Sequence, residues 1–218
     1  MDDVVGVVAA GGHATRMGIK APKSMLTVNG KTLLEYTLLS LQKAGVKTIF
    51  VFTDRKDFVA EQRQLVMGFN SIHVIEDSGV SSTIELLYTA MSLSKKTKYL
   101  FCYGNSPRSS AIYRNMHSCE KALGAIRIIR SSRRDPIKSG NNYLEPPFFV
   151  NLNIYDFACY YSSWSELFYA YADDAFYTNY NIPPEFNTCD EWEKYSRYIN
   201  THLTGDHKPN TYEPLVRQ

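Results

Sequence analysis

Residues 4–27 read VVGVVAAGGHATRMGIKAPKSMLT, an apolar run that leads directly into a glycine-rich loop. The run from Val4 to Ala9 is short, uncharged and rich in valine, which is typical of a strand buried on both faces of a parallel sheet. Gly11 and Gly12 allow the main chain to turn sharply and to bring its N–H groups close to a ligand. Open α/β sheets bind their ligands at the carboxyl ends of such strands. The sequence therefore predicts a ligand-binding loop directly after the first strand.

The same loop carries positive charges suited to a polyphosphate. Arg16 offers a planar fork of N–H donors to phosphate oxygens, and Lys23 adds a compact charge on a flexible stem. The spacing matches neither common phosphate fingerprint, because no G-x-G-x-x-G is present and Lys23 does not open the helix of a G-x-x-x-x-G-K-[ST] loop. A basic surface loop after a core strand is the simpler alternative.

The segments AAGGHATRMG and PKSML resemble the signature loop of the nucleotidyltransferases that activate sugar 1-phosphates, phospho-alcohols and molybdopterin. The resemblance implies that the loop holds the β- and γ-phosphates of a nucleoside triphosphate, while the lysine contacts the α-phosphate under attack. It implies catalytic roles for Arg16 and Lys23. The nucleotide-binding candidates in this loop are Ala9, Ala10, Gly11, Gly12, His13 and Thr15.

Further along the chain, apolar runs alternate with amphipathic stretches. The pattern predicts strands at 49–52, 72–75, 99–103, 125–129 and 148–152, and helices at 33–44, 57–66, 82–93 and 189–199. Strands separated by helices imply right-handed crossovers and a parallel sheet. We therefore expect a three-layer α/β/α, Rossmann-like fold with a mostly parallel sheet, of the nucleotidyltransferase type. Residues 1–203 would form one domain, with a nucleotide-binding half at 1–118, an acceptor-binding half at 119–203 and a tail at 204–218.

A second matching segment, GVSSTIE at residues 79–85, lies between a predicted strand and a predicted helix. In the resembled family a G-x-[AST]-x-[AST] segment lies over the nucleobase, which makes Gly79, Ser81 and Ser82 candidates for base contact. Serine hydroxyls also cap helix N-termini, so helix capping by Ser81 or Ser82 is an equal alternative.

Residues 100–107 read LFCYGNSP and stand where the resembled family has an apolar strand followed by G-D-x-P. The aspartate of that motif binds magnesium, and Asn105 replaces it here. Residues 186–192, FNTCDEW, resemble the family's closing element, and Asn187 falls on its second metal position. An amide in place of a carboxylate removes a full charge from a magnesium site. The resemblance therefore implies a Mg²⁺ site at Asn105 and Asn187, with weakened binding.

Three explanations for these amides stay open. The chain is an enzyme with an altered metal shell that draws on Asp77, Asp190 or Glu191, or it is a catalytically silent descendant, or aspartate was deliberately exchanged for asparagine. Intact Arg16 and Lys23 favour real nucleotide affinity.

The second half carries the acceptor-binding candidates. Arg127 and Arg130 place positive charge on and after a strand and could attract an acceptor phosphate, although a solvated basic turn is an equal alternative. Glu145 and the segment VNLNIY at 150–155 resemble a sugar-contacting element, E…[VF]-N-x-G-[IL]-Y, which makes Asn151 a further candidate. A tyrosine-rich segment follows, which suits an acceptor pocket or a homodimer interface, although core packing explains most of it.

The composition of the chain limits the classes of protein to which it can belong. The chain of 218 residues is 44% hydrophobic and 21% charged, which excludes a disordered protein and a membrane protein. A net charge of +2 gives no footprint of nucleic-acid binding. The four cysteines lie far apart, which indicates neither a zinc site nor disulfides. The charged start runs directly into the first strand and leaves no room for a signal peptide. We expect a cytoplasmic protein.

The resemblance implies transfer of a nucleoside monophosphate from a nucleoside triphosphate, CTP or UTP being favoured, to a small phosphorylated acceptor, with release of pyrophosphate. A sugar phosphate or phospho-alcohol bound for cell-surface polymer fits best. The alternative is a nucleotide-binding regulatory protein that lost turnover. A dinucleotide-dependent oxidoreductase is disfavoured, because the fingerprint is missing and Asp54 is the sole acid at the end of the second strand.

Overall fold

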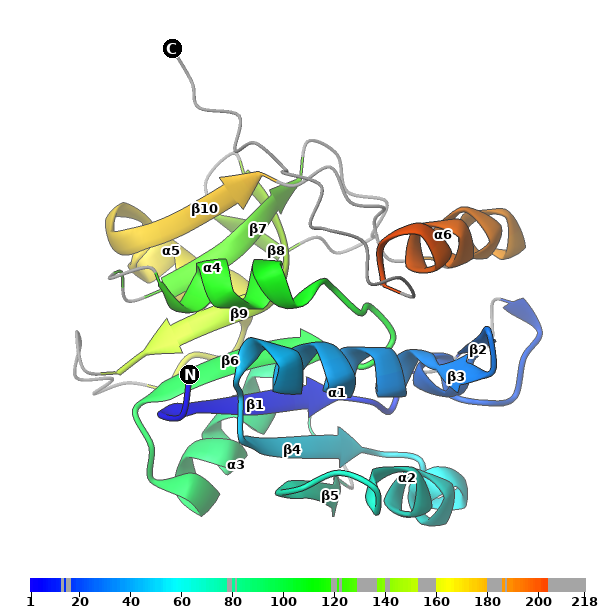
Figure 1. Ribbon diagram of the computed structural model, residues 1–218. Coiled ribbons are helices and arrows are strands. Elements are labelled where there is room, and N and C mark those ends of the chain that lie inside the picture. Colours follow the sequence, from blue (N-terminus) through cyan, green and yellow to red (C-terminus); the bar gives the residue numbers. More distant parts are fainter. Residues whose placement is uncertain are drawn as a thin grey trace.

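The computed structural model describes residues 1–12, 14, 17–77, 80, 82–118, 121, 123–128, 137–139, 142–152, 160–179, 186 and 188–203. Within these residues eight strands form one sheet, in the order β10-β7-β9-β6-β1-β4-β5 with β8 beside β9 (Figure 1). The strands are β1 (Val4–Ala9), β4 (Thr48–Thr53), β5 (Ile72–Glu76), β6 (Lys98–Tyr103), β7 (Leu123–Ile128), β8 (Ile137–Ser139), β9 (Asn142–Asn151) and β10 (Ala175–Asn179).

The first half of the sheet is parallel. β1 pairs in parallel with β4 and with β6, and β4 pairs in parallel with β5. β9 runs antiparallel to β6 and to β7, and β10 is parallel to β7. The sheet is therefore mostly parallel with one reversed strand, which confirms the predicted α/β Rossmann-like fold.

Helices cover both faces of this sheet (Figure 1). They are α1 (Leu33–Ala44), α2 (Val59–Val66), α3 (Ile84–Ser94), α4 (Ser110–His117), α5 (Trp164–Ala170) and α6 (Cys189–His202). Residues of α1, α4 and α6 share one core with Val4 and Val8 of β1, whereas α3 and α5 share the other core with Val5 and Val7. Alternate residues of a strand point to opposite faces, so β1 is buried from both sides, as its valine run predicted.

Local signals set the bounds of α1. Thr32 caps its first turn by accepting from the Glu35 N–H, and the Glu35 carboxylate accepts in return from the Thr32 N–H. This reciprocal pair satisfies two N–H groups that the helix leaves open. Gly45, at φ 97°, ends the helix in the left-handed conformation that glycine adopts without a Cβ clash. The helix predicted at 33–44 is therefore confirmed in full.

The other predicted helices and strands are present in the structure, but several begin or end at different residues. The predicted strand at 148–152 is the end of the longer β9, and the predicted helix at 189–199 continues to His202. The sequence did not predict α4, α5, β8, β10 or the small β2 (Thr27–Val28) and β3 (Lys31–Thr32) hairpin. Two of these, α5 and β10, lie in the tyrosine-rich segment.

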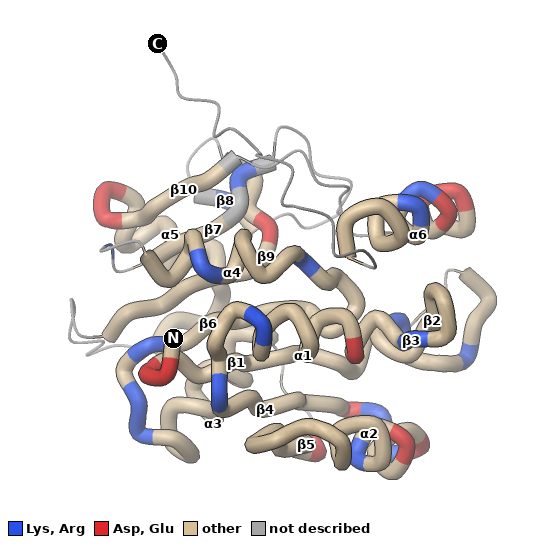
Figure 2. The backbone as a smooth tube through the Cα atoms, viewed as in Figure 1, with Lys and Arg blue, Asp and Glu red and all other residues tan. Residues whose placement is uncertain are grey.

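Charged residues lie mainly at the periphery. Near the N-terminus, Lys47 bonds to Asp2 at 2.6 Å and Lys98 bonds to Asp3 at 2.7 Å, where Figure 2 shows blue and red segments together.

Cys102 is buried, and burial raises the pKa of its thiol to about 12. Among the described residues, no helix combines the length and the apolar character needed to cross a membrane.

Candidate functional site

The loop after β1 is held by main-chain bonds to its neighbours. The Ala10 N–H donates to the Phe52 carbonyl at 2.7 Å, which continues the parallel ladder beyond the strand. The Ser24 hydroxyl donates to the Ala10 carbonyl at 2.6 Å, and the Lys23 N–H donates to the Gly12 carbonyl at 2.9 Å. These bonds join the glycine turn to the segment that carries the lysine, so the loop closes on itself at the carboxyl end of β1.

The two glycines of this loop have different surroundings. A Cβ at Gly11 would lie 2.0 Å from the Asp54 Oδ1 atom and 3.0 Å from the Asp54 main-chain nitrogen, so any larger residue at this position requires Asp54 to shift. A Cβ at Gly12 would meet none of the described residues within 4 Å, and Gly12 is exposed. Gly11 thus serves the packing of the loop, and the open face at Gly12 is where a ligand can approach the main chain.

Lys23 begins a short 3₁₀ turn (Lys23–Met25) and turns its ammonium group inward. The residue is 6% exposed, its Nζ donates to the Phe186 carbonyl at 2.6 Å, and the same Nζ lies 5.2 Å from the centre of the Phe186 ring. Phe186 precedes α6, so Lys23 connects the loop after β1 to the segment that leads into α6.

The end of β6 lies directly beside this loop. Ala9 of β1 pairs with Tyr103 of β6, and the Gly104 N–H donates to the Ala9 carbonyl at 2.8 Å. Asn105 and Ser106 follow and are buried. The structure therefore brings the predicted metal position at Asn105 to the predicted nucleotide loop, as neighbouring parallel strands require.

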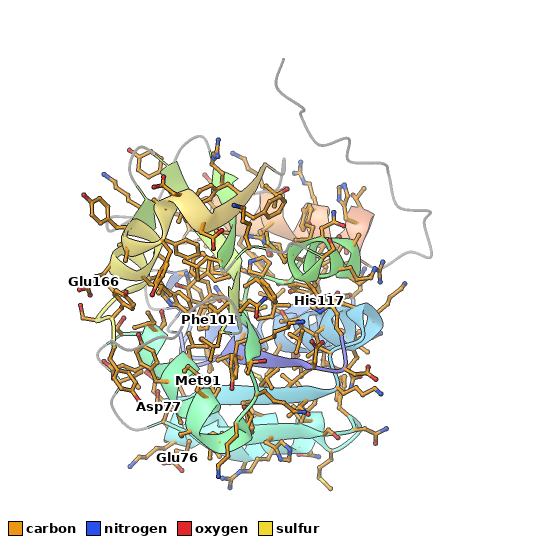
Figure 3. The ribbon with its side chains drawn as sticks, turned by 90° about the vertical axis from the view of Figure 1, so that its left-hand side faces the viewer. Glu76, Asp77, Met91, Phe101, His117 and Glu166 are labelled. Atoms are coloured by element: carbon orange, nitrogen blue, oxygen red, sulfur yellow. The ribbon has the colours of Figure 1, made fainter. Side chains whose placement is uncertain are left out.

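The described donors do not make a magnesium site of the expected kind. Asp77 follows β5, three strands from β6, and a strand spacing of about 4.8 Å puts the two main chains roughly 14 Å apart. Figure 3 shows Asp77 apart from Phe101, a residue of the strand β6 that leads to Asn105. Glu191 caps α6 by accepting from the Thr188 N–H at 3.1 Å. Among the described residues no three carboxylate, histidine or cysteine side chains gather for a metal, and magnesium prefers carboxylates.

A buried arginine, Arg108, follows Asn105 by three residues. Arg108 is 1% exposed, its Nη1 donates to the Tyr195 hydroxyl at 3.3 Å, and that hydroxyl donates to the Pro107 carbonyl at 3.2 Å. Burial disfavours the charged guanidinium, but surrounding groups that include Tyr195 and Glu145 outweigh it, so the pKa of Arg108 stays above its ordinary value. Sequence reasoning missed Arg108 and Tyr195, although an arginine directly after the GNSP segment was a visible signal.

The acceptor candidates do not converge. Glu145 on β9 pairs with Ile126, whereas Arg127 pairs with Leu144, so Glu145 and Arg127 point to opposite faces of the sheet. Glu145 is fully buried on the side of Arg108, and the Arg127 guanidinium lies 5.2 Å from the Tyr177 ring centre.

Asn151 lies at the wrong end of the sheet for the predicted role. It pairs with Lys98, the first residue of β6, whereas Asn105 follows the last residue of that strand. Seven residues at about 3.3 Å each separate the two positions by roughly 23 Å. β9 runs antiparallel, so the carboxyl end of β9 lies at the amino ends of the parallel strands. The structure therefore removes Asn151 from the site.

The base-contact candidates are described in part. Ser82 precedes the N-cap of α3, which is Thr83, and neither the Ser82 nor the Thr83 side chain makes a cap bond in the described residues. The Thr83 hydroxyl instead accepts from the Trp164 indole N–H at 3.1 Å, which ties α5 to the start of α3. The predicted site residues that lie outside the described residues are His13, Thr15, Arg16, Gly79, Ser81, Arg130 and Asn187.

Comparison with known proteins adds three kinds of similarity. Residues 6–151 match the family model of the MobA-like NTP transferase domain. A putative mannose-1-phosphate guanyltransferase of Sulfolobus acidocaldarius is 32% identical over 109 residues, which cover 47% of this chain and 30% of that protein. The chain thus aligns with less than a third of that relative's length.

Solved structures share the fold. A nucleotidyl transferase from Methanothermobacter superposes with a TM-score of 0.70 at 18% identity, covering 91% of this chain and 98% of that one. The 4-diphosphocytidyl-2C-methyl-D-erythritol synthase of Anaerococcus prevotii gives 0.66 at 13% identity, covering 91% and 96%. The Rv0371c protein of Mycobacterium tuberculosis, in complex with manganese, gives 0.61 at 16% identity, covering 89% and 98%. At these identities the likeness concerns the fold.

Proposed function

Because the chain belongs to the MobA-like NTP transferase domain family, we propose that it transfers a nucleoside monophosphate from a nucleoside triphosphate to a small phosphorylated acceptor. The observation that carries the proposal is the meeting of the glycine turn, the buried Lys23 ammonium and Asn105 at the carboxyl ends of β1 and β6. In this proposal residues 1–118 hold the nucleotide and residues 119–203 hold the acceptor.

The proposed reaction is an in-line displacement at the α-phosphorus. An acceptor phosphate oxygen forms the new P–O bond, the bond to the bridging oxygen of the β-phosphate breaks, and pyrophosphate leaves with that oxygen. The attacking phosphate is already ionised, so no general base is required. Positioning and charge neutralisation supply the rate in such transfers. Lys23 would steady the α-phosphate in the transition state, and Arg16 with the loop N–H groups would hold the departing pyrophosphate.

Magnesium enters this proposal with the substrate. Mg²⁺ is commonly held by one or two carboxylates together with substrate phosphates, and Asn105 offers a neutral amide oxygen. We propose that the triphosphate arrives as its magnesium complex and that its own phosphates supply most of the ligands. The protein then contributes cationic side chains and loop N–H groups.

The acceptor and the base are the finer part of the proposal. The name of the Sulfolobus relative, a mannose-1-phosphate guanyltransferase, supports a sugar 1-phosphate as acceptor. The sequence favoured CTP or UTP, and the same name makes GTP a direct competitor. Glu145 belongs to the acceptor-binding half and is buried on the side of Arg108. It is the candidate for holding a sugar hydroxyl.

One observation favours a second candidate function, nucleotide binding without turnover. Asn105 is 7% exposed and occupies the position of the metal-binding carboxylate in the resembled family. A regulatory protein that kept the loop and Lys23 would bind a triphosphate and release no pyrophosphate.

A pairwise screen separates the two functions. The purified full chain is mixed with each of ATP, CTP, GTP and UTP plus magnesium, with mannose 1-phosphate, glucose 1-phosphate or glycerol 3-phosphate as acceptor. Binding heat and pyrophosphate release are measured, and Lys23→Ala is the control. Release in one pairing that the control lacks supports the transferase. Binding heat with no release in any pairing supports the regulatory protein, and no binding at all refutes both.

A further inference from the structure

The position of the Lys23 ammonium is unusually well defined for a lysine. Lysine has a flexible four-carbon stem and loses considerable rotamer freedom when it is held in one place. Here the Phe186 carbonyl accepts from Nζ at 2.6 Å while the Phe186 ring lies under the same atom. An ammonium group has three N–H donors, and the carbonyl fixes the direction of one of them. Phe186, 163 positions away in the chain, thus helps to orient the ammonium.

Phe186 is itself held by α6. Its ring centre lies 4.9 Å from the Trp192 ring and 5.2 Å from the Tyr195 ring, and both Phe186 and Tyr195 are fully buried. We call these three side chains, Phe186, Trp192 and Tyr195, the aromatic wedge. The capping box of Thr188 and Glu191 fixes the start of α6 two residues after Phe186.

The Tyr195 hydroxyl fastens the wedge to the segment that follows Asn105. It donates to the Pro107 carbonyl at 3.2 Å and accepts from Arg108 Nη1 at 3.3 Å. The Arg108 N–H in turn donates to the Tyr113 hydroxyl on α4 at 3.3 Å. A buried hydroxyl with both a donor and an acceptor partner leaves α6 little freedom to slide, since each lost bond would go unreplaced by water.

We propose that the aromatic wedge is a positioning device: Tyr195 anchors it to the 105–108 segment, and Phe186 holds the Lys23 ammonium where the α-phosphate reacts. The part that concerns the α-phosphate rests on the proposed function. Lys23 is the catalytic residue, and Phe186 and Tyr195 are positioning residues that act through it. A charge fixed before the reaction stabilises a transition state better than one that must reorganise. The wedge also couples Lys23 to Asn105, so the two halves of the site keep one geometry.

Tyr195→Phe tests the device and Tyr99→Phe is its matched control. Tyr99 is also fully buried, and its hydroxyl donates to the Lys96 carbonyl at 2.7 Å and contacts the Ser94 hydroxyl at 3.0 Å, at the amino end of β6. Each variant keeps its ring and loses one hydroxyl with two partners. Only Tyr195→Phe should release Lys23.

The readout is the rate at which an acylating reagent labels each lysine of the full chain, followed by mass spectrometry. Lys47, whose side chain is 68% exposed, is the internal reference. We expect Tyr195→Phe to raise the labelling of Lys23 relative to Lys47 about tenfold, and Tyr99→Phe to leave it unchanged. A tenfold change corresponds to about 1.4 kcal/mol. Equal Lys23 labelling in the wild type and in Tyr195→Phe would overturn the positioning device.

Two further measurements guard the test. Phe186→Leu removes the ring under the ammonium while the main-chain carbonyl stays, and it should raise Lys23 labelling even where Tyr195→Phe does not fold. In the pyrophosphate assay, Tyr195→Phe should lower kcat about tenfold with little change in KM, because a group made effective only in the transition state is displaced. A wild type without turnover refutes the proposed transferase, and the labelling experiment still decides whether the wedge positions Lys23.

Discussion

Exchanging Gly11 for alanine should destabilise the protein, whereas the same exchange at Gly12 should not. The added Cβ at Gly11 would lie 2.0 Å from Asp54 Oδ1, 2.8 Å from Asp54 Cγ and 3.0 Å from the Asp54 main-chain nitrogen. Ordinary contact begins at 3.4 Å, so the shortfall at the carboxylate oxygen is 1.4 Å. The side chain can rotate away but the main-chain nitrogen cannot. Overpacking of this kind costs about 1–3 kcal/mol.

Urea unfolding of five proteins measures this effect: the wild type, Gly11→Ala, Gly12→Ala, Asp54→Ala and the double variant Gly11→Ala with Asp54→Ala. Gly12→Ala should stay within about 0.5 kcal/mol of the wild type, because its added Cβ would have no neighbour within 4 Å among the residues that the structure describes. The double variant should recover at least about 1 kcal/mol relative to additivity, since the clashing carboxylate is gone. Equal unfolding midpoints for Gly11→Ala and Gly12→Ala would refute the packing argument.

Nucleotide affinity should show the reverse order. A methyl group at the open face of Gly12 would stand where a phosphate approaches the loop, so we expect Gly12→Ala to weaken triphosphate binding about tenfold, or about 1.4 kcal/mol. Calorimetric titration of the stably folded variant measures it. Unchanged affinity in Gly12→Ala would mean that the ligand does not approach the turn from this side.

Asn105→Asp should lower the free energy of unfolding by about 1–3 kcal/mol in EDTA, because the buried carboxylate then has no cation beside it. Millimolar magnesium should restore that stability. Thermal unfolding with and without magnesium checks this, and a variant whose stability is the same in EDTA and in magnesium contradicts it. Trp164→Phe should cost about 1–2 kcal/mol through the lost bond to the Thr83 hydroxyl and some packing; an unchanged urea midpoint would count against that bond. Asp3→Asn should cost a few tenths of a kcal/mol at pH 7, because the bond to Lys98 on an exposed pair lowers the Asp3 pKa below 3.8. Since the folded pKa is lowered, the Asp3 contribution is present above pH 3.8 and is lost as the pH falls through the lowered pKa, so the two proteins should converge in urea titrations below that pKa.

The sequence was most informative where local signals agree. The valine run of β1 and the helix predicted at 33–44 each rest on residues close together in the sequence, and the structure matches both. The glycine turn and Lys23 were also found from the sequence, because a ligand loop must follow a buried parallel strand at its carboxyl end. Local periodicity and turn chemistry therefore predicted the fold class, and the functional role of the glycine turn and Lys23 stays a prediction.

Elements with weak local signals were missed. α4 has only eight residues, and its buried apolar positions, Ile112, Tyr113 and Met116, are too few to distinguish a helix from a loop by periodicity. α5 and β10 lie among tyrosines, which suit strands and helix faces alike. α5 and β10 pack against the core around Phe101, Phe148 and Trp164, whereas α4 packs in the core on the other face of the sheet. Such partner surfaces are not visible in a short window of sequence.

Long-range contacts account for the rest. Lys23 meets Phe186 across 163 residues and Arg108 meets Tyr195 across 87, and spacing alone cannot place such pairs together. Asn151 was misplaced for a related reason. The motif gave its residue type, but the direction of β9 decides which end of the sheet it occupies, and a reversed strand carries no distinct local signature.

If the proposed function holds, the burial of Asn105 bears on the stability of the site before a metal is bound. A carboxylate that is 7% exposed at position 105 would have to be neutralised by a metal or by protonation, because burying an uncompensated charge is costly. An amide avoids that penalty and adds no negative charge beside the Lys23 ammonium, which helps the site to accept an anionic ligand. In the proposed function, the site should then hold the triphosphate tail chiefly through side-chain and loop N–H contacts, and the magnesium that arrives with the triphosphate should matter chiefly for the chemical step. Triphosphate affinity that collapses in EDTA while Lys23 stays intact would contradict this division of roles.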